Sequence, residues 1–203
     1  MLLQIHPDNP DERKIKQVVE CLKDGGVIIY PTDTVYGIGC DINNKKAIER
    51  ICRIKGIKID KADFSFVCYD LSNLSEYVMP VENSVFRLLK KNLPGSFTFI
   101  LRANNLVPKI FQSKKKTVGI RVPDNKICRT VMKEFGTPIM TSSITEENDF
   151  KDYPNDPEII YEMYENLVDI VIDGGMGGKT PSTIVDCTGD DVVIVREGKG
   201  VLS

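Results

Sequence analysis

The sequence is organised around one stretch, Gly25-Gly26-Val27-Ile28-Ile29-Tyr30-Pro31-Thr32-Asp33-Thr34-Val35-Tyr36-Gly37-Ile38-Gly39. The apolar run from Val27 to Tyr30 predicts a buried strand, because two glycines precede it and a proline follows it. The strand ends in Thr-Asp-Thr, which offers hydroxyl and carboxylate oxygens, and the later glycines let the backbone approach a ligand closely. Such a strand end is typical of a small-molecule pocket, or of a turn whose polar side chains bond their own backbone.

Composition and charge are those of an ordinary globular protein. With 203 residues, 41% of them hydrophobic and 28% charged, the chain is long enough for one ample core, and we expect a single domain over residues 1–203. The net charge of −2 provides no overall basic field, so any nucleic-acid surface has to be local. Residues 1–10 do not resemble a signal peptide, and no apolar run approaches the length of a membrane span, so no membrane partner is expected.

The six cysteines and the single histidine limit the chemistry available. The cysteines lie far apart, mostly in apolar runs and without a Cys-x-x-Cys pair, which predicts reduced thiols and a cytoplasmic location. His6 lies near the N-terminus and is the one histidine of the chain. We therefore expect neither a Cys/His zinc site nor a His-based catalytic triad.

Helical and strand patterns alternate along the whole chain. The first helix is expected to begin at Pro10, with Asn9 as its N-cap, and to stop at Gly25-Gly26. Further helices are predicted over residues 44–54, 84–91, 125–135 and 158–167, and strands over 2–5, 27–30, 64–68, 97–101, 117–123, 138–143, 168–172, 184–186 and 192–196. This alternation predicts an α/β (mixed α+β) fold, a single-domain three-layer sandwich around a twisted, mixed β-sheet.

A glycine-rich segment, residues 173–183, imitates a phosphate-binding P-loop because it contains Gly-Gly-Lys-Thr at 177–180. A P-loop needs a glycine where Asp173 stands and a helix after the threonine. Pro181 and the β-branched run after it predict a strand instead. We therefore exclude an ATPase P-loop and expect this segment to contribute hydroxyl groups.

Hydroxyl and cationic side chains recur where the predicted strands and helices end. Lys55 follows the second helix and precedes a glycine, and Arg121 ends a predicted buried strand, where an unpaired arginine is rare. With few acids or bases among them, these side chains suit a phosphorylated ligand and catalysis by positioning, and do not suit a hydrolase with a protein nucleophile. The candidate site residues are Thr32, Thr34, Lys55, Thr117, Arg121, Thr141, Ser142, Ser182 and Arg196.

The same motifs resemble those of the YrdC/YciO family. The stretch from Gly25 to Asp41 is similar to the family signature. The resemblance continues, in order and over nearly the whole chain, through Arg53-Ile54-Lys55-Gly56, Pro94-Gly95-Ser96-Phe97-Thr98, Val118-Gly119-Ile120-Arg121-Val122-Pro123, Thr141-Ser142, Pro181-Ser182-Thr183-Ile184-Val185-Asp186 and Arg196-Glu197-Gly198. It implies a three-layer fold with a concave, locally basic cleft.

The resemblance also implies an activity, that of a threonylcarbamoyl-AMP synthase. Such an enzyme joins L-threonine, bicarbonate and ATP, releases pyrophosphate, and feeds the modification of adenosine 37 in tRNA. Mg²⁺ would be bound chiefly through the phosphates of ATP, with no dedicated protein metal site. The implied roles are substrate binding by Thr32, Thr34, Arg121 and Ser182, nucleotide binding by Lys55, Thr117, Thr141, Ser142 and Arg196, and catalysis by Lys55, Arg121 and Arg196.

Two departures from the synthase pattern are typical of the YciO branch. Ile57 stands where the synthases carry an arginine, and Ile144 where they carry a nucleotide-binding asparagine. Losing a charged contact to a phosphate costs about 1.5–3 kcal/mol, although Lys58 could replace part of it.

Three functions therefore stay open. The first is a synthase with weak or altered activity, and the second is a non-catalytic protein that binds double-stranded RNA, tRNA or a nucleotide. The third is the reverse chemistry, removal or transfer of a carbamoyl-type group. A local basic face would serve the second function, with Arg50, Arg53, Lys58 and Lys114–Lys116, and residues 145–157 are a candidate lid over the cleft.

Overall fold

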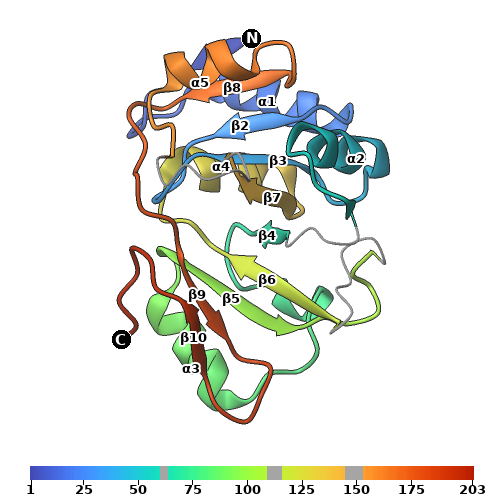
Figure 1. Ribbon diagram of the computed structural model, residues 1–203, viewed down its shortest axis with the longest axis vertical. Helices are drawn as coiled ribbons and strands as arrows, with labels where there is room; N and C mark the ends of the chain where they lie inside the picture. Colours follow the sequence, from blue (N-terminus) through green and yellow to red (C-terminus); the bar gives the residue numbers. More distant parts are fainter. Residues whose placement is uncertain (60–63, 109–115, 145–152) are drawn as a thin grey trace.

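The computed structural model describes residues 1–59, 64–108, 116–144 and 153–203. In this part of the chain ten strands form one sheet, drawn edge to edge down the molecule in Figure 1. Parallel and antiparallel neighbours alternate irregularly within it, so the sheet is mixed, as the sequence predicts. The strand order is β1 (Leu2–Gln4), β8 (Ile170–Asp173), β2 (Ile28–Tyr30), β3 (Gly37–Asp41), β7 (Ile139–Ser143), β4 (Ser65–Val67), β6 (Thr117–Arg121), β5 (Phe97–Arg102), β9 (Thr183–Asp186) and β10 (Val193–Arg196).

Helices cover both faces of this sheet, which confirms the predicted three layers. On one face α1 (Glu12–Lys23) and α4 (Lys126–Phe135) bury their apolar stripes against β2, β8 and the start of β7. On the other face α2 (Lys45–Ile54), α3 (Asn83–Asn92) and α5 (Pro157–Tyr164) pack over a larger core. A short 3₁₀ turn, Leu74–Glu76, precedes α3. None of the helices described is both long and apolar enough to cross a membrane.

Strand periodicity explains why one part of the sheet is left polar. Phe99, Leu101, Val118 and Ile120 point into the larger core, so their neighbours Thr98, Gly119 and Arg121 point to the opposite face. The apolar cluster that α1 and α4 build on this opposite face does not extend to β5, β6 and β9. Among the residues that the structure describes, no helix covers this part of the face, which therefore provides the place for a site.

The first helix begins later than predicted. Its N-cap is Asp11 and not Asn9, because the Asp11 carboxylate accepts hydrogen bonds from the backbone N–H groups of Arg13 (2.8 Å) and Lys14 (3.2 Å). The backbone N–H of Asn9 instead donates to His6 Nδ1 (3.1 Å), so this residue belongs to the preceding turn.

Strand β3 was not predicted, because its glycines were interpreted as a loop that approaches a ligand. They serve a buried strand instead: a Cβ atom on Gly39 would lie 2.6 Å from the carbonyl oxygen of Met140 on β7. Close approach of neighbouring backbone is the reason for glycine here. The exclusion of a P-loop is confirmed, since no helix follows β8 before β9 begins.

Candidate functional site

The loop between β2 and β3 is fixed by its own hydroxyl groups. Thr32 Oγ1 accepts a hydrogen bond from the Thr34 backbone N–H (3.0 Å) and donates to the carbonyl oxygen of Val35 (2.7 Å). The Thr32 hydroxyl is therefore used inside the loop, in the turn arrangement that the sequence left open as an alternative. Thr34 is fully buried next to it, with its hydroxyl 3.1 Å from that of Thr32.

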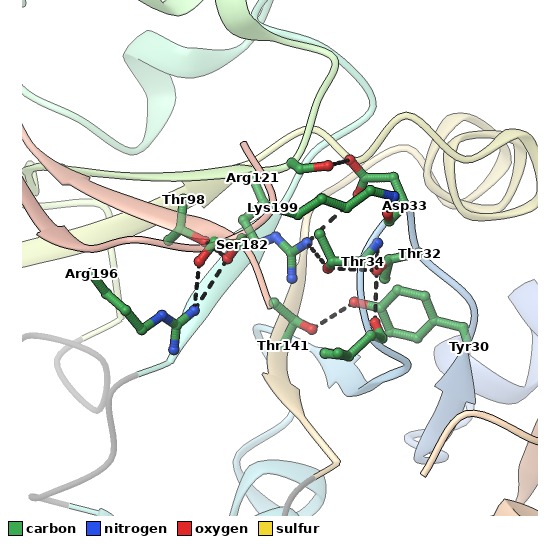
Figure 2. Close-up of polar contacts among 12 residues, drawn as sticks. Tyr30, Thr32, Asp33, Thr34, Thr98, Arg121, Thr141, Ser182, Arg196 and Lys199 are labelled. Carbon is green, nitrogen blue, oxygen red and sulfur yellow. Dashed lines mark hydrogen bonds and ion pairs between the residues drawn. The ribbon is translucent and has the colours of Figure 1, made fainter. Parts of the chain in front are cut away.

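Arg121 meets this loop from the end of β6. Its Nη2 atom donates to Thr34 Oγ1 (2.9 Å) and lies 3.7 Å from the Asp33 carboxylate. Only 8% of the arginine is exposed, so the cation is nearly removed from water and needs these partners. Figure 2 shows the guanidinium between the loop on one side and Ser182 on the other.

Ser182 and Arg196 form the opposite wall. The Ser182 hydroxyl lies 2.8 Å from that of Thr98, and Arg196 Nη2 donates to the Ser182 carbonyl oxygen (2.8 Å). Arg196 reaches this position because β10 carries an irregularity at Val195, which pairs Arg196 with Ile184. Without that extra residue the valine would face Ile184, so the bulge aims the arginine at the site.

A third wall comes from β7. The hydroxyl groups of Thr141 and Tyr30 lie 2.6 Å apart and both residues are buried. Burial raises the pKa of the Tyr30 phenol, so this group stays neutral. One of the two hydroxyls donates to the other in a single hydrogen bond. Gly119 on the neighbouring strand packs closely against the pocket residue Ser65, since a Cβ atom at position 119 would lie 2.5 Å from Ser65 Oγ.

These walls enclose a pocket of about 100 Å³ (Figure 2). Its lining includes two arginines and no acidic side chain among the described residues, which favours an anionic ligand. Partial burial lowers the pKa of Arg196, and the charge of Arg121 lowers it further, against a raising effect of Tyr153. The residues that line the pocket are Val35, Ser65, Thr98, Arg121, Thr141, Ser142, Ser143, Pro181, Ser182, Ile184 and Arg196.

Five of the nine candidate residues line this pocket, and the others lie around it. Thr32 and Thr34 stand behind Arg121, as described. Lys55 Nζ donates to the carbonyl oxygen of Ser143 (2.7 Å), which places the amine at the edge of the pocket. Thr117 shares the pocket face of β6 but stands four residues before Arg121, about 13 Å along the strand.

Four residues around the pocket were not among the sequence-based candidates: Thr98, Ser96, Lys199 and Asp33 with its carboxylate. Ser96 Oγ donates to Asp33 Oδ2 (2.8 Å), and Lys199 Nζ donates to the Asp33 carbonyl oxygen (2.6 Å). Strand alternation could have indicated Thr98, since it is a polar residue between two buried phenylalanines. Nothing in the sequence pattern brings Ser96 or Lys199 to Asp33, because three separate segments meet there.

The two departures from the synthase pattern differ in their surroundings. Ile144 is 2% exposed and belongs to the larger core, where Tyr164 donates a hydrogen bond to its carbonyl oxygen (3.3 Å). Ile57 is half-buried just beyond α2. Ile144 is thus part of the core packing, while Ile57 follows Lys55 and Gly56 in the turn after α2.

Two sequence-based predictions fall outside the described residues. Most of the candidate lid, residues 145–152, and the lysines at 114 and 115 are not among them. Of the basic face, Arg50 is engaged in an ion pair with Asp169 (2.7 Å). Asp169 also accepts a hydrogen bond from the backbone N–H of Val27, so the pair lies before β2 begins, at the other end of this strand from Thr32 and Thr34.

Comparison with known proteins identifies the family. The family model Sua5_yciO_yrdC, described as "Telomere recombination", matches residues 20–198. The chain belongs to the Sua5/YciO/YrdC family. It is 46% identical over 198 residues to "Uncharacterized protein YciO" of Escherichia coli strain K12, covering 97% of this chain and 94% of the relative. The crystal structure of E. coli YciO has a TM-score of 0.93 with this chain at 44% identity, covering 99% of this chain and 97% of that one.

The family also contains named enzymes. "Threonylcarbamoyl-AMP synthase" of Coxiella burnetii is 28% identical to this chain over 167 residues, covering 81% of this chain and 87% of the relative. The crystal structure of P. abyssi Sua5 complexed with L-threonine shares the fold, with a TM-score of 0.89 at 24% identity. The match covers 98% of this chain and 57% of that longer one. The Sua5/YciO/YrdC chain described here is thus related to threonylcarbamoyl-AMP synthases.

Proposed function

We propose that this chain is a threonylcarbamoyl-AMP synthase-like enzyme, which joins L-threonine, bicarbonate and ATP and releases pyrophosphate. Its product would feed the modification of adenosine 37 in tRNA. The observation that carries the proposal is the pocket between Arg121 and Arg196, where two guanidinium groups and the hydroxyls of Thr98, Thr141 and Ser182 converge.

The size of this pocket favours an amino-acid head group as its occupant. Pockets for drug-sized ligands measure about 300–1,000 Å³, whereas this one measures about 100 Å³. A carboxylate would meet Arg121, and the ligand's other polar atoms would meet the Ser182 and Thr98 hydroxyls. The threonine bound to P. abyssi Sua5 agrees with an occupant of this kind.

The nucleotide would lie at the open side of the pocket, toward Lys55, Ser142 and Arg196. In forming threonylcarbamoyl-AMP, an oxygen of the threonine carbamate attacks the α-phosphorus of ATP and the bond to pyrophosphate breaks. The cations would stabilise the charge that develops on the phosphate oxygens, so catalysis would rest on positioning and electrostatics. Thr117 is assigned to the nucleotide on the family resemblance alone, since it stands about 13 Å from Arg121.

We also propose that Mg²⁺ would be carried by the phosphates of ATP. The described residues contain no cluster of three or more His, Cys, Asp or Glu side chains that could hold a metal ion. Mg²⁺ ordinarily binds through one or two carboxylates together with substrate phosphates and water.

A second function, nucleotide or RNA binding without catalysis, is favoured by the two isoleucines. With Ile144 buried in the core and Ile57 beside Lys55, the nucleotide would lose two polar contacts relative to the synthases. The reverse transfer of a carbamoyl-type group has no separate observation in its favour.

Pyrophosphate release from ATP and bicarbonate, with and without L-threonine, tests the proposal. We expect threonine-dependent release from the wild type and a loss of about 10- to 150-fold in Arg196→Ala, because a charge-assisted contact to phosphate contributes about 1.5–3 kcal/mol. Arg102→Ala is the matched control, since that exposed arginine on β5 donates only to the Thr188 carbonyl oxygen among the described residues.

The opposite result would support the second function. A folded wild type that releases no pyrophosphate above background, yet binds RNA or a nucleotide, would be a binding protein. RNA affinity that falls steeply as salt rises would identify contacts to the phosphate backbone.

A further inference from the structure

Asp33 is a buried carboxylate behind the pocket, and the chemistry proposed above does not use it. Only 8% of its side chain is exposed. Its Oδ2 atom accepts a hydrogen bond from Ser96 Oγ (2.8 Å), and its Oδ1 atom faces Arg121 Nη2 at 3.7 Å (Figure 2). This Oδ1 atom has no hydrogen-bond partner among the described residues, which is costly for a buried charge.

Arg121 divides its guanidinium between the loop and the pocket. Nη2 donates to Thr34, and Nε is buried without a hydrogen-bond partner in the described part of the chain. No hydrogen bond found among the described residues uses Nη1, and the arginine lines the pocket. The Asp33 carboxylate and the Thr34 hydroxyl therefore both engage Nη2, which leaves the Nη1 side of the guanidinium for a ligand in the pocket.

The position of Asp33 is itself set by two other segments. Ser96, in the turn before β5, holds the carboxylate, and Lys199 Nζ holds the Asp33 carbonyl oxygen (2.6 Å). The Lys199 backbone N–H donates to the Pro181 carbonyl oxygen (2.8 Å), so the segment after β10 ties the loop to the Ser182 wall. Three segments distant in sequence, with Arg121, Ser96 and Lys199, thus converge on one residue, two of them on its carboxylate and one on its carbonyl oxygen.

We infer that Asp33 is a positioning residue for Arg121, which it neutralises and orients so that the free edge of the guanidinium faces the carboxylate of the bound amino acid. This inference rests on the proposed function. Outer groups that orient a ligating side chain commonly change affinity or activity 10–100-fold when they are removed.

Stability alone cannot establish this role. Removing one partner of any buried ion pair destabilises a protein, whether or not the pair orients a ligand group. The decisive measurements are therefore substrate-specific kinetics and the coupling between Asp33 and Arg121.

Asp33→Asn is the main variant, because an amide keeps the shape of the side chain and can still accept the hydrogen bond of Ser96. We expect the KM for L-threonine to rise about tenfold or more, with the KM for ATP within about twofold of the wild type. Ser96→Ala, which keeps the charge and removes the hydrogen bond to Oδ2, should raise the KM for L-threonine about threefold. Asp169→Asn is the matched control, because it breaks an ion pair far from the pocket, with Arg50.

A double-mutant cycle tests whether Asp33 acts through Arg121. In an Arg121→Lys background, Asp33→Asn should add less than about twofold to the KM for L-threonine, since the oriented group is already absent. A full additional tenfold loss, or an unchanged KM in Asp33→Asn alone, would overturn the role assigned to Asp33.

A readout that needs no ligand separates this inference from the proposed function. The ¹⁵N–¹H resonance of Arg121 Nε, assigned by its disappearance in Arg121→Lys, should exchange slowly with water in the wild type because Nε is buried. In Asp33→Asn we expect exchange at least about tenfold faster, while Asp169→Asn leaves it unchanged. Unchanged exchange in Asp33→Asn contradicts the inference, even if pyrophosphate release is observed. Absence of that release in the wild type contradicts only the proposed function.

Discussion

At the scale of single residues, the two isoleucines show that equivalent departures in sequence can have different physical meanings. Ile144 follows the last residue of β7 and points into the larger core, under Tyr164 of α5. Ile57 lies in the turn after α2, beside Gly56, whose φ of 66° favours glycine. Only the second position can accept a charged side chain without entering the core.

Ile144→Asn, which restores the residue of the synthases, should destabilise this protein. The change removes apolar packing and buries an amide in an apolar core, so we expect the free energy of unfolding to fall by about 3 kcal/mol. Urea unfolding followed by circular dichroism measures the loss. A loss below about 1 kcal/mol would mean that the amide finds hydrogen-bond partners in the core.

Ile57→Arg should instead be tolerated and should help the proposed reaction. A guanidinium beside Lys55 adds a cation where the phosphates are expected, so pyrophosphate release should rise about tenfold, with a change in unfolding free energy below about 1 kcal/mol. Steady-state kinetics on both proteins give the comparison, and Ile57→Gln controls for side-chain length without charge. Equal rates for the arginine and glutamine variants would place the phosphates elsewhere.

At the scale of elements, β3 and the bulge in β10 carry the site. Strand β3 lets β7 pack closely enough for Tyr30 and Thr141 to share a hydrogen bond (2.6 Å), and the bulge at Val195 aims Arg196 at the pocket. Sequence patterns identified both β2 and β10. They did not identify β3, because its glycines resemble a loop although they are needed for the close approach of the neighbouring backbone.

Gly39→Val should therefore be severely destabilising. Its Cβ would lie 2.6 Å from the Met140 carbonyl oxygen and 2.9 Å from Ile139 Cδ1, and the backbone oxygen cannot move without disrupting the sheet. We expect a loss of about 2–3 kcal/mol in unfolding free energy. Gly189→Ala, at an exposed turn with nothing nearer than 3.8 Å, should change stability by less than about 0.5 kcal/mol. Equal stability of the two variants would contradict the close packing of β3.

At the scale of the whole molecule, the mixed sheet is covered unevenly. Helices α1 and α4 cover one half of a face (Figure 1). By strand alternation the other half presents Thr98, Gly119 and Arg121. Segments distant in sequence meet at this half, which is why the pocket draws on β4, β5, β6, β7, β9 and β10 and on the loops that contain Val35 and Ser182. All six cysteines are free thiols, as the sequence predicts, and four of them are buried.

The other two thiols, those of Cys21 and Cys187, are partly buried and should make the protein sensitive to alkaline pH. Burial raises the pKa of Cys21 and of Cys187 from the model-compound value of 9.0 to about 11. Between pH 9 and 11 the unfolded chain loses these protons while the folded chain keeps them, so stability present below pH 9 falls as pH rises. Thermal unfolding between pH 8 and 11 should show a falling Tm, and a smaller fall in the Cys21→Ala Cys187→Ala variant. An equal fall in both proteins would exclude these two thiols as the cause.

The sequence by itself determined the alternation of helices and strands, the absence of P-loop chemistry and five of the eleven residues that line the pocket. These follow from local causes, namely apolar periodicity, caps, breakers and the rarity of an unpaired arginine at the end of a buried strand. Only the tertiary structure decided that Thr32 and Thr34 stand behind Arg121, that Ile144 faces the core and that Ser96 and Lys199 meet Asp33. Those relations depend on which strands become neighbours and on a one-residue bulge, and such non-local register leaves no periodic trace in the chain.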